Sequence, residues 1–287
     1  MTRPGGFVSL GPVNAPFVFK LALSFLVGGL WVAAGLALAE RRGPRLGGLI
    51  IGFPSTVLFA LFFIAWTLSA GAAVQAAAVI PAVHGINCLY VLVAVSLLPR
   101  GLAAALSAGL GVWFALATVL VAAKFDGFLP GLFIYAGLLL LSYSIIGRMT
   151  AGWPRPERLP RSTPLVILGR GAFGGAIVVL AVVLAKAGGP LVGGVFAIFP
   201  AVFTAALVAT YASRGPAFSA AVMRASLLGG TSVVVYAAVV RLTYPPLGLG
   251  FGTAVSAAAA IGSTVLIRAL SPKRDRHAAP GPGGRPV

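Results

Sequence analysis

The polar residues inside the long apolar stretches of this chain are few, and they are its candidates for chemistry. His84 and Asn87 lie one helical turn apart within residues 71–98. An ionisable side chain inside a membrane helix is costly, so it commonly marks a functional site. We expect His84 and Asn87 to contact a substrate; the alternative for His84 is a neutral imidazole bonded to a backbone carbonyl, with a packing role only.

Two prolines at matching positions of a repeated segment define a second candidate site. Residues 43–54 (GPRLGGLIIGFP) recur as residues 189–200 (GPLVGGVFAIFP), an offset of 146 residues (189 minus 43). A helix interrupted by proline at the same place in two halves of a membrane protein indicates a binding site near the bilayer midplane. The alternative is a pair of kinks that serve helix packing. The residues expected to line this site are Pro54, Ser55, Thr56, Pro200 and Thr204.

Arg224 is the charged candidate. It follows the loop residue Arg214 by ten positions, so it lies roughly 10 to 15 Å below the membrane surface at about 1.5 Å per residue. The first copy of the repeat has Ala78 at the matching position, so the shared scaffold needs no cation there. We therefore expect Arg224 to contact an anionic substrate. The alternatives are a backbone carbonyl freed at a helix break, lipid phosphate, or a side chain that extends to the membrane interface. The shallower Arg170 is expected to extend to that interface.

The acidic residues exclude several classes of chemistry. All four lie outside the apolar stretches: Glu40, Asp126, Glu157 and Asp275. Without a carboxylate in a span, neither a cation pathway nor a carboxylate acid–base pair is expected. His84, His277 and a single cysteine, Cys88, do not make a metal site or a disulfide within the chain. We expect no catalytic residue, no metal and no cofactor.

Composition indicates a membrane protein. Of the 287 residues 59% are hydrophobic and 9% are charged, where about a quarter are charged in soluble domains. The formal charge of +17 comes from Lys and Arg spread over short loops and a tail, which is typical of orientation in a membrane and not of nucleic-acid binding.

The elements that must position these residues follow from the apolar stretches and the repeat. Since a span needs about twenty apolar residues, we predict an all-α protein with nine transmembrane helices. Their ranges are 17–39, 46–68, 71–98, 101–123, 127–147, 165–186, 191–212, 217–240 and 246–269. The break after residue 68 rests on the repeat, because the turn at Tyr211–Pro216 predicts one near Ser69–Gly71 in the first copy.

The predicted organisation is two copies of four helices with one helix between them. Copy one covers 17–124, the linker helix and a cytoplasmic loop cover 125–164, and copy two covers 165–270. Because four plus one crossings is an odd number, the second copy is inserted upside down, as an inverted-topology repeat. Residues 1–16 form an N-terminal tail, and residues 271–287 a disordered basic tail beside the lipid headgroups.

The distribution of basic residues predicts the orientation. With the N-terminus outside, fourteen Lys and Arg fall in the inner loops and C-terminal tail. The five on the outer side are Arg3, Lys20, Lys124, Lys186 and Arg241. Positive charge concentrates on the cytoplasmic side of membrane proteins, so we predict an outside N-terminus and a cytoplasmic C-terminus.

The repeated Gly-Gly-x-x-x-x-Phe-Pro segment, at Gly47–Pro54 and Gly193–Pro200, carries a resemblance. One copy resembles the small four-helix bacterial inner-membrane proteins of unknown function that have a similar segment, over residues 20–124 and 166–270. The resemblance implies a duplicated and fused chain in the cell inner membrane, and it supplies no catalytic residues. The 4+1+4 plan is also similar in outline to that of the drug/metabolite transporters.

These features favour a secondary transporter or flippase that moves an anionic or neutral organic solute by alternating access. Its expected partners are that solute and membrane lipid, not nucleic acid. One alternative is a membrane-embedded enzyme with His84 as base, which lacks a second titratable group in a span. Another is a structural or assembly protein without a path for solute.

Overall fold

The computed structural model describes residues 15–41, 50, 54–153 and 163–270, and all regular structure in these ranges is helical. The predicted all-α class is confirmed. The elements are α1 (Ala15–Arg41), α3 (Ser55–Thr67), α4 (Ala70–Leu97), the 3₁₀ turn η1 (Leu98–Arg100), α5 (Leu102–Ala122), α6 (Phe128–Met149), α7 (Pro164–Gly188), α8 (Pro190–Ala197), α9 (Ala201–Gly229) and α10 (Thr231–Leu270). The predicted tails, most of the 148–164 loop and the segment before Pro54 lie outside the described residues.

Seven helical stretches in the described residues are long and apolar enough to cross a membrane, which indicates a multi-pass membrane protein. The sequence predicts nine, and the difference has two sources. Helix α3 has 13 residues, too few to span alone. The stretch Arg214–Leu270 counts as one run of 57 residues.

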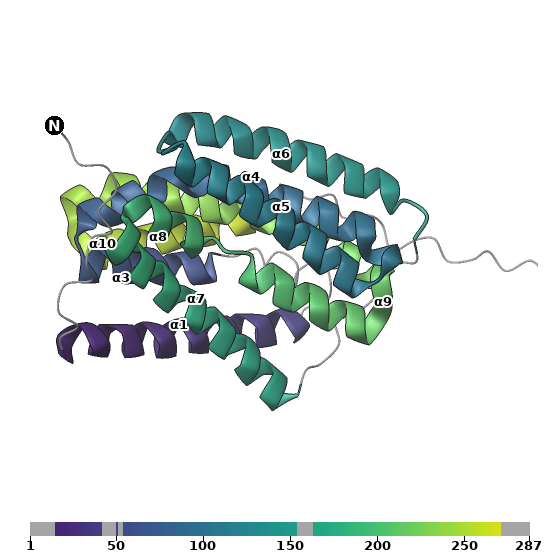
Figure 1. Cartoon of the computed structure of the whole chain (residues 1–287), viewed down its shortest axis with the longest axis horizontal. Coiled ribbons are helices and arrows are strands. Elements are labelled where there is room, and N and C mark those ends of the chain that lie inside the picture. The colour runs from purple at the N-terminus through teal and green to yellow at the C-terminus, as the bar shows by residue number, and fades with distance from the viewer. Residues whose placement is uncertain (1–14, 42–49, 51–53, 154–162, 271–287) are drawn as a thin grey trace, which may run out of the picture.

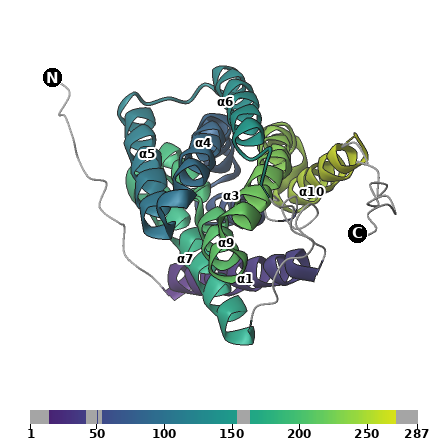
Figure 2. The same ribbon diagram turned by 90° about the vertical axis from the view of Figure 1, so that its right-hand side faces the viewer.

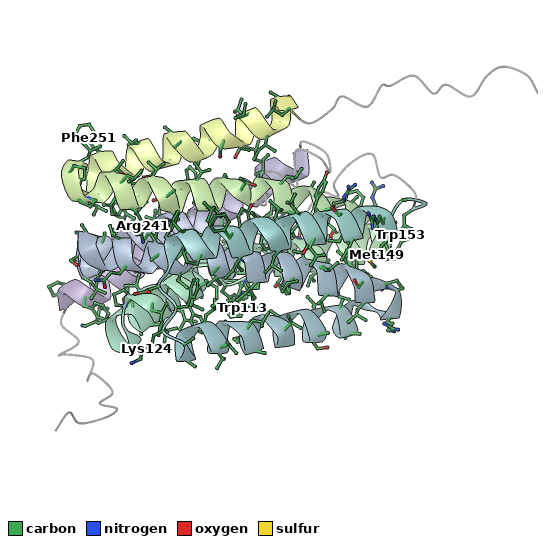
Figure 3. The ribbon with its side chains drawn as sticks, turned by 90° about the horizontal axis from the view of Figure 1, so that it is seen from above. Trp113, Lys124, Met149, Trp153, Arg241 and Phe251 are labelled. Carbon is green, nitrogen blue, oxygen red and sulfur yellow. The ribbon has the colours of Figure 1, made fainter. Side chains whose placement is uncertain are left out.

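The chain reverses within that long run. Gly248 has φ 70° and ψ −178°, a conformation that glycine adopts readily and that interrupts α10. The two parts of α10 then pack on each other, with Tyr244 Oη 2.9 Å from Thr253 Oγ1 and Thr243 Oγ1 3.2 Å from Ser256 Oγ. Figure 3 shows this reversal at the end of the bundle where Phe251 is labelled.

Helix α4 is the centre of the bundle. Within Ala70–Arg100, 83% of an 18-residue apolar segment is buried, a larger share than in the other candidate spans. The end-on view in Figure 2 shows α4 surrounded by other helices, and its contacts are with α3, α5, α6, α8, α9 and α10. Alanines fill much of the α4 sequence, and small residues let neighbouring helices approach closely. His84 and Asn87 on α4 are therefore kept from lipid.

Contacts along α6 define the directions of the central helices. Ala82 packs on Gly131 near the start of α6, and Ser96 Oγ lies 3.7 Å from Met149 Sδ at its end, so α4 and α6 run parallel. Tyr135 contacts Thr231, whereas Arg224 contacts Tyr143 further along α6, so α6 runs antiparallel to the chain from Arg224 to Thr231. Helix α4 is thus antiparallel to residues 216–243, its counterpart at the 146-residue offset.

Helices α1 and α7 cross closely at glycines (Figure 1). A Cβ added at Gly29 would lie 2.9 Å from the carbonyl oxygen of Gly171, and one added at Gly175 would meet the carbonyl of Phe25. The two contacts are equivalent at the 146-residue offset, because Gly175 is the counterpart of Gly29 and Gly171 is the counterpart of Phe25. These pairings also show that α1 and α7 run antiparallel. The contact of Gly28 with Val178 and the contact of Gly174 with Val32 are equivalent in the same way. Reciprocal contacts of this kind are typical of a two-fold relation between equivalent surfaces.

The predicted turn after the second apolar stretch is present. Helix α3 ends at Thr67 and α4 begins at Ala70, where Ser69 Oγ accepts a hydrogen bond from the backbone N–H of Ala72 at 3.0 Å. This is an N-cap, which satisfies one free donor of the new helix. At the matching position of the second copy, Gly215 has φ 77° and interrupts α9.

Candidate functional site

The candidate site begins at a helix break. Helix α8 ends at Ala197 and α9 begins at Ala201, so the predicted break at Pro200 is present. Helix α3 begins directly after Pro54, whose φ of −73° and ψ of 48° match the −74° and 40° of Pro200. Both prolines are buried. Proline donates no backbone hydrogen bond and clashes with a preceding helical turn, which accounts for the break.

Asn87 connects α4 to this break. Its Nδ2 donates to the carbonyl of Ile198 at 2.9 Å, which satisfies a backbone acceptor in the non-helical segment. The side chain is 3% exposed, and its Oδ1 has no hydrogen-bond partner among the described residues. The amide nitrogen of Asn87 thus binds the segment between α8 and α9, and its amide oxygen is available as an acceptor beside that segment.

His84 lies one turn before Asn87 and is also 3% exposed. Its ring centroid is 5.4 Å from that of Tyr135 and 6.2 Å from that of Phe203. Its Nε2 packs on Gly230, where a side chain would overlap the imidazole. Gly230 is the counterpart of His84 in the second copy. In the part of the chain that the structure describes, Nδ1 has no hydrogen-bond partner, so no described carbonyl is bonded to that nitrogen.

Trp113, which sequence reasoning missed, borders the break from α5. It is fully buried, and its ring lies 5.1 Å from that of Phe199 and 6.1 Å from that of Phe196. None of the described residues forms a hydrogen bond with its Nε1. Figure 3 shows Trp113 within the bundle, away from both ends. Together His84, Asn87 and Trp113, which we call the polar cluster, border residues 196–203. Buried polar atoms are nearly always hydrogen-bonded in proteins, so three unpartnered ones at one break need an explanation.

Thr204 has a partner from the first copy. Its Oγ1 lies 2.9 Å from the hydroxyl of Tyr90, one turn beyond Asn87 on α4. The counterpart of Tyr90, Tyr236, donates to the carbonyl of Leu58 at 3.4 Å. Leu58 is itself the counterpart of Thr204, so these contacts are reciprocal too. Thr204 therefore lies beside the break but is engaged in joining the two copies.

The other predicted residues at the first proline are only partly described. Pro54 accepts a backbone hydrogen bond from Leu58 at 2.9 Å, and Thr56 is buried in the first turn of α3. Ser55 is the first residue of α3, and its side chain lies outside the described part.

Arg224 does not join the polar cluster. Its Nε donates to the carbonyl of Tyr143 at 3.3 Å, and its Cζ lies 4.2 Å from the centroid of the Tyr143 ring. Gly147 leaves room for the guanidinium, since a Cβ there would lie 2.8 Å from Cζ. Arg224 precedes Gly230 by six residues, about 9 Å along a helix. The half-buried guanidinium thus contacts the last turns of α6, on one side of the cluster.

No three His, Cys, Asp or Glu side chains in the described ranges are close enough to hold a metal ion. The polar cluster has one imidazole, one amide and one indole, and this donor set fits hydrogen bonding to an organic molecule better than metal coordination.

Comparison with known proteins gives no match to a protein-family model, to a curated protein or to a solved structure.

Proposed function

We propose that the chain is a secondary transporter or flippase for an anionic or neutral organic solute. The observation that carries this proposal is the pair of matched proline positions, with buried and unpartnered polar atoms beside the break at Pro200. Interrupted helices at equivalent places of two halves are the binding elements of many secondary transporters. Movement at these breaks would open the polar cluster to each side of the membrane in turn.

Nine crossings in an inverted 4+1+4 arrangement, in a bacterial inner membrane with the N-terminus outside, form part of the proposal. The reciprocal contacts of α1 with α7 support it, as do the antiparallel directions of α4 and residues 216–243. The interruption at Gly248 would divide the run Arg214–Leu270 into two crossings, and the interruption at Gly215 would separate this run from the preceding span Pro190–Ala212. Duplication of a small four-helix membrane protein would produce this arrangement.

A membrane-embedded enzyme with His84 as base is the alternative. The described ring neighbours of the imidazole are Tyr135 and Phe203, and Gly230 packs on its third side. None of these is a carboxylate that would orient the ring or share its proton. This environment favours solute binding over acid–base chemistry.

Uptake into proteoliposomes tests the transport proposal. The panel contains organic anions, organic cations, neutral solutes and lipid-linked sugars, and we expect saturable uptake of an anionic or neutral member. Cations are expected to be excluded, because the described spans α3 to α10 contain no carboxylate. Selective uptake of a cation would contradict the proposal.

Arg224→Ala tests whether the solute is an anion. For an anionic solute we expect the variant to insert normally and to lose uptake, because an anion inside the bundle needs a cationic partner. Arg170→Ala, on the first turns of α7, is the matched control and is expected to change uptake little. Normal anion uptake by Arg224→Ala would remove Arg224 from the solute path.

A further inference from the structure

We propose that the polar cluster of His84, Asn87 and Trp113 binds an uncharged organic molecule that has a flat apolar part and one group able both to donate and to accept hydrogen bonds, such as a primary amide. This inference rests on the proposed transport function and narrows its substrate class from anionic or neutral to neutral.

The free atoms of the cluster have complementary hydrogen-bonding roles. Trp113 Nε1–H can only donate, and Asn87 Oδ1 can only accept. His84 Nδ1 does either, according to the tautomer. A primary amide offers an oxygen to the indole and two N–H groups to the acceptors. Such a ligand satisfies atoms that would otherwise each cost free energy in a buried site.

The walls beside these atoms are aromatic. Phe196 and Phe199 pack against Trp113 on one side of the break, and Tyr135 and Phe203 flank His84 on the other. Ligand sites are commonly lined by apolar and aromatic groups with a few placed polar atoms. A flat apolar part of the ligand would pack against these rings.

The charges near the cluster argue against an ion as the bound species. Among the described contacts of His84, Asn87 and Trp113 there is no Lys, Arg, Asp or Glu. Arg224 lies six residues before Gly230 in the sequence, and its guanidinium contacts the carbonyl and the ring of Tyr143. A carboxylate buried at the cluster would have no countercharge, which is strongly unfavourable in an apolar interior. An uncharged ligand avoids that cost.

Benzamide, benzoate and toluene form a matched set of probes for this site. They share a ring and differ in carrying a neutral amide, a negative charge or no polar group. In the variant Trp31→Phe/Trp66→Phe/Trp153→Phe, Trp113 is the remaining indole, so its fluorescence reports on the cluster directly. We expect saturable quenching or a spectral shift with benzamide, and binding at least about tenfold weaker for benzoate and toluene, the effect of losing one hydrogen bond or more. Equal binding of benzoate, or no response to any probe, would overturn the proposal.

Variants identify the contact atoms. Asn87→Leu and His84→Leu are each expected to weaken benzamide binding about tenfold in the same background. Asn87→Leu also removes the hydrogen bond to Ile198 and could prevent folding, whereas His84→Leu breaks no hydrogen bond at Nδ1. If Asn87→Leu misfolds, the binding measured with His84→Leu tests the assignment. Thr67→Val is the control, because it removes another unpartnered hydroxyl at the far end of α3. Unchanged binding in His84→Leu would contradict the assignment.

The outcomes separate this site from the transport proposal. Benzamide binding without uptake of any solute into proteoliposomes would refute transport and keep the site. Saturable uptake of a solute without benzamide binding to the cluster would keep transport and refute the site.

Discussion

At the scale of single residues, one hydrogen bond between Tyr90 and Thr204 joins the two copies of the repeat. The two oxygens are 2.9 Å apart and partly buried. We expect Tyr90→Phe and Thr204→Val each to lower the free energy of unfolding by about 1 kcal/mol, the usual net value of such a bond. The double variant should lose little more than either single one, because both remove the same interaction.

Reversible unfolding in mixed micelles measures this double-mutant cycle. Thr204→Ser keeps the hydroxyl and is the control, expected to stay closer to the unmodified protein than Thr204→Val. Strictly additive losses would mean that the two hydroxyls do not interact.

The sequence predicts a site residue only where its type is unusual for its surroundings. His84 and Asn87 stand out because polar side chains are rare in an apolar helix. Trp113 does not, since tryptophan in such a helix is most simply explained as a lipid-facing or packing residue. Its burial, and the unpartnered indole nitrogen, depend on which helix packs against α5. Tyr143 is hidden for the same reason, because Arg224 meets it through tertiary packing.

At the scale of elements, the crossing of α1 and α7 depends on glycine at the contact. We expect Gly175→Ala to destabilise the protein by about 1–3 kcal/mol, because its Cβ would meet the carbonyl of Phe25 and force the helices apart. Gly169→Ala on the same helix is the matched control. A Cβ there meets nothing within 4 Å, so this change should be neutral or slightly stabilising, since alanine is the better helix former. Equal effects of the two substitutions would show that close approach at Gly175 is unimportant.

Element boundaries are largely predictable because their causes are local. Proline accounts for the break at Pro200, and turn-forming residues account for the interruption of α9 at Gly215. The repeat predicts the matching interruption at Ser69, where the first copy has no glycine–proline pair. The number of crossings is less predictable, because α3 has 13 residues, too few to span a membrane alone, and α10 is interrupted at Gly248 within one long helical run.

At the scale of the whole molecule, the basic residues Lys124 and Arg241 lie near one end of the bundle, and Trp153, before an arginine-rich segment of the sequence, lies near the other. Figure 3 shows Lys124 and Arg241 near one end, and Met149 and Trp153 at the other. Arg241 and the start of α6 meet there, with the guanidinium carbon 4.9 Å from the ring centroid of Phe128. The segment after Met149 belongs to the loop richest in arginine among the inter-helix loops. The proposed orientation requires this arginine-rich loop to be cytoplasmic, and Lys124 and Arg241 to lie on the outer side.

Cysteine labelling tests that orientation. In a Cys88→Ser background, which removes the buried natural thiol, single cysteines replace Ala123 at the end of α5 and Gly152 after α6, both exposed positions. A membrane-impermeant maleimide applied to intact cells should label Ala123→Cys, whereas Gly152→Cys should react only in inverted vesicles, because one crossing by α6 separates them.

A third cysteine, replacing Lys273 in the C-terminal tail, decides the proposed inversion. Four crossings follow the linker helix in the 4+1+4 arrangement, and an even number returns the chain to the side it left. Lys273→Cys must therefore react from the same side as Gly152→Cys. An odd number of crossings after residue 152 would place the two on opposite sides. The reciprocal contacts of α1 with α7 would then describe packing between helices and not two halves inserted in opposite directions, and the matched prolines would lose their shared place at the membrane centre.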